Sequence, residues 1–462
     1  MSTEPLTTAE PLATLRSTVS CPVVTPTDPG YDDARRVYNG MVDVRPAAVV
    51  QARTVGDVVA TVNAARELGL ELAVRGGAHS VPGFGTTDGG IVCDLSGMAG
   101  VDVDPVARTA RVGGGATLHD LDAATHEHGL ATPAGIISTT GVGGLTLGGG
   151  IGHLSRGFGL ACDNLVGAEV VTAGGDVVRA SESENSDLFW ALRGGSGNFG
   201  VVTSFEFRLH EVKDVYGGPI FYPIDRAGEV MAFYREFIET APEELGAFFA
   251  FQIAPPLEFI PAERHGETMC LIVTCWSGDP QDGPSAVAPL LDAAPVVAQG
   301  LGTMPYPALN SAFDALLPPG LQHYWKAAFV SELTDDAIRE HLTWGPQVPC
   351  VESTMHLYPI NGASQRVPAD ATAWGHRDAS FACVIAGMWP DPADSEANTA
   401  WVRSYYDGIA PHSEPGGYVN FLSDDDAARR PDSYGANYER LREIKRRYDP
   451  TNVFRRNQNI EP

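Results

Sequence analysis

Apolar and polar residues follow two alternating periods in the first part of the chain. Between residues 48 and 77, two short apolar runs are typical of buried strands, and the segment 54–69 between them places apolar residues at helical spacing. Thr54 is the predicted N-cap of this helix, and Gly69 is the residue predicted to end it. The pattern therefore predicts a strand–helix–strand unit that runs into the glycine-rich stretch 73–85.

The same alternation continues to about residue 209. It predicts strands at 90–96, 109–115 and 200–209, helices at 117–129 and 186–195, and a hairpin at 165–181. Between these elements lies 141–164, the most glycine-dense segment of the chain. Because open α/β sheets usually bind ligands at the carboxyl ends of their strands, the stretch 73–85 is the first candidate for a binding loop.

The pattern changes after Val212, where glycine becomes rarer and proline and aromatic residues become more frequent. Strand-like runs at 248–254 and 269–276 alternate there with helical patterns such as 227–241, which predicts a second α+β domain. The chain ends in one amphipathic helix followed by a polar segment. These changes divide the chain into an N-terminal extension (1–38), a first domain (39–212), a second domain (213–426) and a C-terminal segment (427–462).

Charge and cysteine content narrow the class of protein. With 58 acidic and 31 basic residues, the net charge of −27 argues against a nucleic-acid partner, which would need basic patches. No apolar run reaches the roughly 20 residues of a membrane span, and no secretory signal is evident. The seven cysteines form no C-x-x-C pair and the histidines show no zinc-ligand spacing, so we expect reduced thiols, a cytoplasmic location and no metal site.

The two glycine-rich loops, 75–80 and 141–152, contain more glycine than ordinary turns need. Each glycine costs conformational entropy on folding, so a ligand is expected to offset that cost. A diphosphate bound by backbone N–H groups would do so without lysine. Neither loop has the P-loop or G-x-S-x-G pattern, and the partial G-x-G-x-x-G pattern lacks its acidic partner, so a Rossmann fingerprint is weak.

Four separated motifs carry a resemblance that covers nearly the whole chain. They are VRGGAHS at 74–80, TPAGIISTTGVGGLTLGGGIGHLSRGFGLACDNL at 132–165, DLFWALRGGSGNFGVVTSFEF at 187–207 and YDPTNVFRRNQNI at 448–460. Together they resemble the FAD-linked oxidases of the vanillyl-alcohol oxidase (PCMH-type FAD-binding) superfamily, in its berberine-bridge-enzyme-like branch.

The resemblance implies an α+β fold with a two-part FAD-binding domain of the PCMH type and an antiparallel-sheet substrate domain with helices. Residues 39–212 would be the FAD-binding domain and 213–426 the substrate-binding domain. Residues 427–462 would return to the FAD-binding domain.

In this family the histidine of the R-G-G-x-H-S motif is bonded covalently to the flavin, and the matching residue is His79. Ile137 stands where many relatives have a second linking cysteine, so the resemblance implies FAD attached through His79 alone. Thr140, near the ring, is small enough to leave room for dioxygen. The resemblance further implies these FAD contacts: Arg75, Gly76, Gly77, Ala78, Ser80, Thr140, Gly141, Gly144, Gly200, Val202, Asn457 and Asn459.

Acid or base chemistry on the substrate is expected from the second domain. Residues 416–421, GGYVNF, resemble the family's Y-x-N strand, in which Tyr418 and Asn420 would point to one side because strand side chains alternate. The same alternation brings Glu352 and His356 within reach of a common face. Two alternatives stay open: a strand tyrosine is more often a packing residue, and the WGHRD segment could be a structural ion-pair cluster.

The sequence therefore predicts an FAD-dependent oxidase. It would abstract hydride from a small alcohol, amine or activated C–H compound and reduce dioxygen to hydrogen peroxide. Three alternatives remain: an oxidative cyclase or oxygenase of natural-product tailoring, a flavin dehydrogenase with another acceptor, and a flavoprotein that binds without turnover. The substrate and the oligomeric state do not follow from the sequence.

Overall fold

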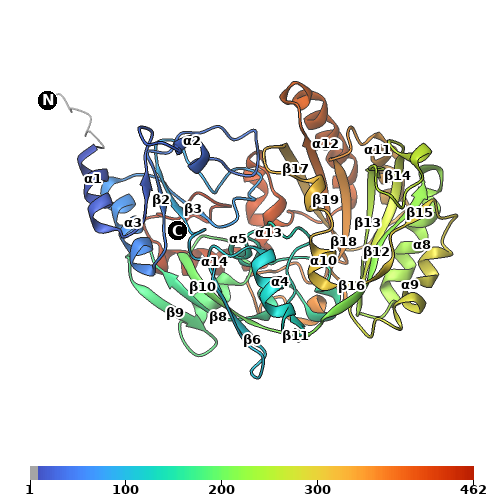
Figure 1. Ribbon diagram of the computed structural model, residues 1–462, viewed down its shortest axis with the longest axis horizontal. Helices are drawn as coiled ribbons and strands as arrows, with labels where there is room; N and C mark the ends of the chain where they lie inside the picture. Colours follow the sequence, from blue (N-terminus) through green and yellow to red (C-terminus); the bar gives the residue numbers. More distant parts are fainter. Residues whose placement is uncertain (1–8) are drawn as a thin grey trace.

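The computed structural model describes residues 9–462, and its chain forms two halves that meet along a broad interface (Figure 1). The first half carries two small sheets, and the second carries one large antiparallel sheet. The mixed α+β fold class expected from the sequence is confirmed. The domain boundaries themselves stay a prediction.

The first sheet has the strand order β1-β2-β4-β3. Its strands are β1 (Val23–Val24), β2 (Ala48–Gln51), β3 (Leu72–Arg75) and β4 (Ile91–Asp94), and β4 pairs in parallel with both β2 and β3. The crossover helix α3 (Val55–Leu68) begins with a capping box between Thr54 and Asp57 and ends at Gly69, whose φ is +63°. The predicted strand–helix–strand unit and both of its helix-terminal residues are therefore confirmed.

The second sheet is antiparallel, with the order β5-β6-β10-β8-β9. Its strands are β5 (Val101–Asp104), β6 (Thr109–Gly113), β8 (Leu165–Val171), β9 (Val177–Ser181) and β10 (Val201–Arg208). Short helices connect them, namely α4 (Leu118–His126), α5 (Val142–Leu147), α6 (Ser155–Phe158) and α7 (Ser186–Leu192). The glycine-dense segment lies between α4 and β8, and α5 within it starts directly after Gly141.

The large sheet has the order β15-β12-β14-β13-β18-β19-β17, with β16 paired to β12. Its strands are β12 (Asp214–Pro223), β13 (Leu245–Ile253), β14 (Thr268–Trp276), β15 (Ala298–Gln299), β16 (Gly302–Pro305), β17 (Gln322–Val330), β18 (Thr354–Pro359) and β19 (Phe381–Trp389). Four helices pack against it, namely α8 (Ala227–Thr240), α9 (Gly283–Leu291), α11 (Asp335–Trp344) and α12 (Ser395–Ile409). They cover the face that is turned away from the first half (Figure 1).

Strand alternation divides this large sheet into two faces with different partners. On β13, Phe249 and Phe251 belong to the core under the helices, whereas Phe248 and Ala250 belong to the core shared with the first half. On β18, Leu357 belongs to the helix side in the same way, and its neighbour Tyr358 to the other side. Because side chains alternate along a strand, one face of the sheet packs against its helices and the other face packs against the first half.

The C-terminal segment crosses back to the first half, where the C-terminus lies beside β3 and α14 (Figure 1). The ammonium group of Lys445, on α14 (Tyr438–Tyr448), is fully buried. It donates to the Asp449 carboxylate at 2.7 Å and to the carbonyls of Asn198 and Phe454 at 2.8 and 2.9 Å. These bonds satisfy the buried charge and attach the tail to the loop before β10.

All seven cysteines are free thiols, and six of them are buried. Within residues 9–462, no helix combines the length and the apolar character needed to cross a bilayer, and no group of three potential metal-binding side chains occurs.

A buried ion pair connects the two halves. The Arg377 guanidinium donates to both carboxylate oxygens of Asp163 at 2.7 and 2.8 Å, and the two side chains are 2% and 7% exposed. Arg377 also donates to Thr372 and to the Ser364 carbonyl. The structure therefore supports the interpretation of the WGHRD segment as a structural ion pair. Arg377 does not line the cavity described below.

Replacing Asp163 with Asn should reduce the free energy of unfolding by about 3 kcal/mol, because a buried arginine would lose its ionic partner. The matched control is Glu206→Gln, which removes the half-buried partner of the exposed Arg179 side chain and should cost less than about 1 kcal/mol. Chemical denaturation of both variants measures the difference. Equal losses would show that burial does not strengthen the interdomain pair.

Candidate functional site

The two glycine-rich loops touch through their backbones. A Cβ on Gly77 would lie 2.6 Å from the Cα of Gly141 and still closer to its nitrogen, and a Cβ on Gly141 would lie 2.9 Å from the Cα of Gly77. Distances this short leave no room for any side chain at either position. The contact places the loop after β3 against the start of α5.

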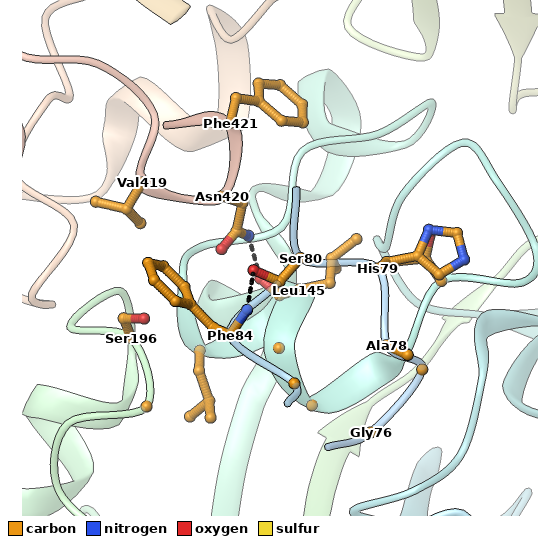
Figure 2. Close-up of a pocket in the computed structure, with 18 of the residues that line it drawn as sticks. Gly76, Ala78, His79, Ser80, Phe84, Leu145, Ser196, Val419, Asn420 and Phe421 are labelled. Atoms are coloured by element: carbon orange, nitrogen blue, oxygen red, sulfur yellow. Dashed lines mark hydrogen bonds between the residues drawn. The ribbon is translucent and has the colours of Figure 1, made fainter. Parts of the chain in front are cut away.

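A cavity of about 310 Å³ opens beside this contact and reaches the large sheet. Figure 2 shows its loop side, with Gly76, Ala78, His79, Ser80 and Phe84 on one segment and Val419, Asn420 and Phe421 approaching from another. The predicted residues that line it are Arg75, Gly76, Gly77, Ala78, His79, Ser80, Thr140, Gly141, Gly144, Gly200, Val202, Asn457, His356, Tyr418 and Asn420. The fold therefore gathers residues from both halves and from the C-terminal segment around one space.

His79 is held by stacking and by hydroxyl groups. Its ring lies parallel to that of Tyr38, with centroids 3.9 Å apart, and Nε2 is 3.0 Å from the Thr139 hydroxyl. Burial lowers the pKa of His79 to about 4, so the imidazole is neutral at physiological pH. A neutral ring retains a nitrogen lone pair for bonding, which an imidazolium would lack.

Asn420 lies in a 3-10 turn, Val419–Phe421, and Tyr418 is the residue directly before it, so the strand predicted for this segment is wrong. Gly416 enters the turn with a φ of +82°, which a straight strand cannot accommodate. The two side chains still meet, because the Asn420 amide donates to the Tyr418 hydroxyl oxygen at 2.8 Å and to the Leu145 carbonyl at 3.0 Å. The second of these bonds is drawn in Figure 2.

The glycine run after α5 makes room for this turn. A Cβ on Gly148 would collide with the Asn420 amide, and the Gly150 N–H donates to the Tyr418 hydroxyl oxygen at 2.8 Å. Gly149, with a φ of +126°, lies against the Trp374 ring. The glycines at 148–150 therefore serve packing and contact with the second half, and none of the three lines the cavity, although the sequence assigned this run to a ligand-binding loop.

Tyr418 is a buried neutral phenol. Burial raises the pKa of its hydroxyl, although the two N–H donors on its oxygen act in the opposite direction. Because both donors occupy lone pairs of the oxygen, the hydroxyl proton remains available to an acceptor in the cavity.

His356 and Tyr358 form a second pair on the wall made by β18. The His356 Nδ1 is 2.6 Å from the Tyr358 hydroxyl, and the Phe248 ring packs against both with centroid distances of 4.8 and 5.0 Å. Burial lowers the pKa of His356 to about 3 and raises that of Tyr358. Both groups are neutral, so this wall is polar in places but uncharged.

Other predicted residues occupy different positions. The Arg75 guanidinium is bound to Asp94 at 2.7 Å and to the carbonyls of Ala34 and Arg36. Asn459 does not belong to the cavity lining, and Glu352 lines a smaller adjoining chamber instead. Arg75 therefore supports the loop, with its charge already paired.

The sequence analysis missed several lining residues. Tyr38, which stacks on His79, belongs to the segment assigned to the N-terminal extension. Trp325 reaches the cavity from β17, and its indole N–H is buried without a partner among the described residues. No local motif marks either residue, since both reach the site through contacts distant in sequence.

The site has features that fit an FAD cofactor. Small residues line the loop side, where a ring and a diphosphate can approach backbone N–H groups closely. The Asn457 side-chain oxygen is buried without a partner among the described residues, and such an acceptor suits the ring N–H of an isoalloxazine. Asn457 is itself fixed by bonds to the carbonyls of Gly197 and Phe454.

Comparison with known proteins agrees with this fit. The chain matches the FAD binding domain model over residues 46–181 and the berberine and berberine-like model over residues 417–461. An FAD-linked oxidoreductase of Dictyostelium discoideum is 33% identical over 430 residues, spanning 90% of this chain and 89% of the relative. The (R)-6-hydroxynicotine oxidase of Paenarthrobacter nicotinovorans is 30% identical, over 95% of this chain and 96% of the relative.

Solved structures show the same fold. The crystal structure of 6-hydroxy-D-nicotine oxidase from Arthrobacter nicotinovorans has a TM-score of 0.86 with this chain at 27% identity, covering 96% of this chain and 98% of the other. The fold and site thus define an FAD-linked oxidoreductase with a PCMH-type FAD-binding domain. Within that class, the chain belongs to the berberine-bridge-enzyme-like family.

Replacing Gly77 with Ala should abolish flavin binding and destabilise the fold by about 1–3 kcal/mol, because the added methyl overlaps the Gly141 backbone. Gly56→Ala is the control, since its Cβ would meet only the Thr54 hydroxyl, at 3.6 Å. Flavin absorbance per mole of protein and the unfolding midpoint measure both effects. Full flavin content in the Gly77 variant would contradict the role of this contact.

Proposed function

We propose that the protein is an FAD-dependent oxidase that removes hydride from a small organic substrate, an alcohol, an amine or an activated C–H compound. The observation that carries the proposal is the cavity of about 310 Å³, which joins the glycine loops and His79 to the uncharged wall of the large sheet. Bound FAD would accept the hydride and pass two electrons to dioxygen, giving hydrogen peroxide. The chain would supply binding, orientation and proton handling.

His79 is proposed as the one covalent attachment point for FAD. Its neutral imidazole lies at the cavity edge, where stacking on Tyr38 fixes the plane of the ring. Ile137 lines the cavity at the position of the second linking cysteine in relatives, and no cysteine lies among the lining residues. Cys162 is buried and its thiol faces Asp163 at 3.8 Å, away from this role.

Tyr418 is proposed to orient the substrate through its hydroxyl. The Gly150 N–H and the Asn420 amide fix the phenol oxygen, so the hydroxyl proton can be donated to a substrate heteroatom. The same two donors stabilise negative charge on the oxygen if the phenol accepts or transfers a proton during turnover. His356 and Tyr358 complete the wall as neutral hydrogen-bonding groups.

Intact mass measured under denaturing conditions should show wild-type protein heavier than the bare chain by one FAD. His79→Ala should show the mass of the bare chain, and any flavin should separate on denaturation. Thr139→Val is the matched control, because it removes the 3.0 Å contact to His79 but leaves the imidazole in place. A wild-type mass equal to the bare chain would overturn the covalent link.

Oxygen use distinguishes the proposed oxidase from its alternatives. Hydrogen peroxide formed in proportion to product supports it, and oxygen incorporated from dioxygen into the product supports an oxygenase. Slow reoxidation of photoreduced protein in air would support a dehydrogenase with another acceptor.

Replacing Tyr418 with Phe should lower the rate of flavin reduction by about 100-fold or more, the usual scale for a positioned acid or base. The ring packing against Trp374 and Phe421 would be kept, so flavin content should be unchanged. Anaerobic stopped-flow reduction measures the effect, and Tyr358→Phe is the comparison. If the two variants lose rate equally, Tyr418 has no special role in the reaction.

A further inference from the structure

A smaller chamber of about 40 Å³ adjoins the main cavity on the side of the large sheet. Its remaining walls are mostly apolar, from β13, β14 and the segment around residue 315. The side chains that line both spaces are Ile136, Ile137, Leu317, Thr354, His356 and Met388. A volume of this size, little more than one or two water molecules need, admits a slender chain but not a second ring.

One acidic side chain, Glu352, lines the chamber, and no lysine or arginine does. Glu352 forms no ion pair with any described residue, and its side chain lies near the Cys350 thiol. The other ionisable group on these walls, His356, is neutral because burial lowers its pKa to about 3. The chamber therefore carries negative charge with no cation to balance it.

The cations of the main cavity are already engaged. Arg75 is paired with Asp94, and Arg456 donates to the Thr86 carbonyl beside the Phe84 ring. Both lie on the loop side of the cavity and do not line the chamber. A ligand that enters the chamber is thus the available partner for Glu352.

The segment that carries Glu352 is fixed in place. Ser353 is fully buried, and its hydroxyl both donates to the Met388 carbonyl and accepts from the Met388 N–H, at 2.8 and 2.9 Å. The Gln252 amide donates to the carbonyl of Val351, at 3.3 Å. Because hydrogen bonds hold the chain on each side of Glu352, little conformational entropy would be lost when a ligand binds, which favours affinity.

We propose that Glu352 selects substrates that combine an apolar body with a terminal ammonium group. This inference rests on the proposed oxidase function and narrows its substrate class. Glu352 precedes His356 by four residues, up to about 13 Å of extended chain. The ammonium group is therefore a recognition group at the far end of the substrate, while the carbon to be oxidised lies beside Tyr418.

The test uses three probes that differ only in the group at the chain end: phenylhexylamine, phenylhexanol and phenylhexanoate. Anaerobic isothermal titration calorimetry at neutral pH, on holoenzyme whose flavin has been reduced beforehand, measures binding without turnover. Wild-type protein should bind the amine at least about tenfold more tightly than the alcohol, since hydrogen bonds to charged groups are the stronger ones, and the carboxylate least.

Glu352→Gln should remove the preference for the amine and leave alcohol binding unchanged. Glu352→Lys should reverse the order, so that the carboxylate binds best. Glu263→Gln is the matched control, because Glu263 is exposed and its substitution changes the net charge equally. Unchanged unfolding midpoints would show that the variants are folded.

The outcomes separate this inference from the proposed function. If the amine preference depends on Glu352 but no probe or related amine reduces the flavin, the recognition site stands and the oxidase proposal fails. If substrates are oxidised with peroxide release but Glu352→Gln and Glu352→Lys leave the order of binding unchanged, the inference is overturned. Loss of the preference in Glu263→Gln as well would assign it to overall charge and also overturn the inference.

Discussion

The close backbone contact between Gly77 and Gly141 is the constraint on which the site depends. It brings the end of a parallel strand and the start of α5 to a separation that no side chain permits. His79 follows two residues later and therefore enters the cavity from a position fixed by backbone packing. Thr139 and Thr140, just before Gly141, then lie beside the imidazole at 3.0 and 3.5 Å. One contact thus positions both the imidazole and its hydroxyl partners.

A second set of close contacts joins the glycine-rich segment 141–152 to the second half. Gly148 and Gly149 lie against Asn420 and Trp374, and the Gly150 N–H donates to the Tyr418 hydroxyl, so the turn after Tyr418 packs against the segment that follows α5. Arg156, buried among backbone carbonyls near the end of α8, adds five hydrogen bonds between the halves, four to those carbonyls and one to the Asn361 side chain. Relative movement of the two halves would break these contacts together, which favours a rigid, preformed site.

Much of the fold followed from periodicity, because the features concerned are local. The capped helix after Thr54 and the amphipathic helix near the C-terminus depend on neighbouring residues, and both lie where the pattern placed them. The 3-10 turn at Tyr418 could not be found this way, since alternating side chains suit a strand equally and the bend depends on Gly416. Tyr38 reaches His79 only through tertiary packing, for which no local pattern exists.

The chemistry of the cavity follows from the absence of net charge on its rings. Burial keeps His79 and His356 neutral and Tyr358 and Tyr418 protonated, so none of these four rings carries a charge. In such a medium the N–H donors on the Tyr418 oxygen act more strongly than they would in water. A carboxylate among these rings would disturb this balance. Glu352 lines the adjoining chamber and not the main cavity, so its charge acts on these rings over a longer distance, at which the Coulomb interaction is weaker.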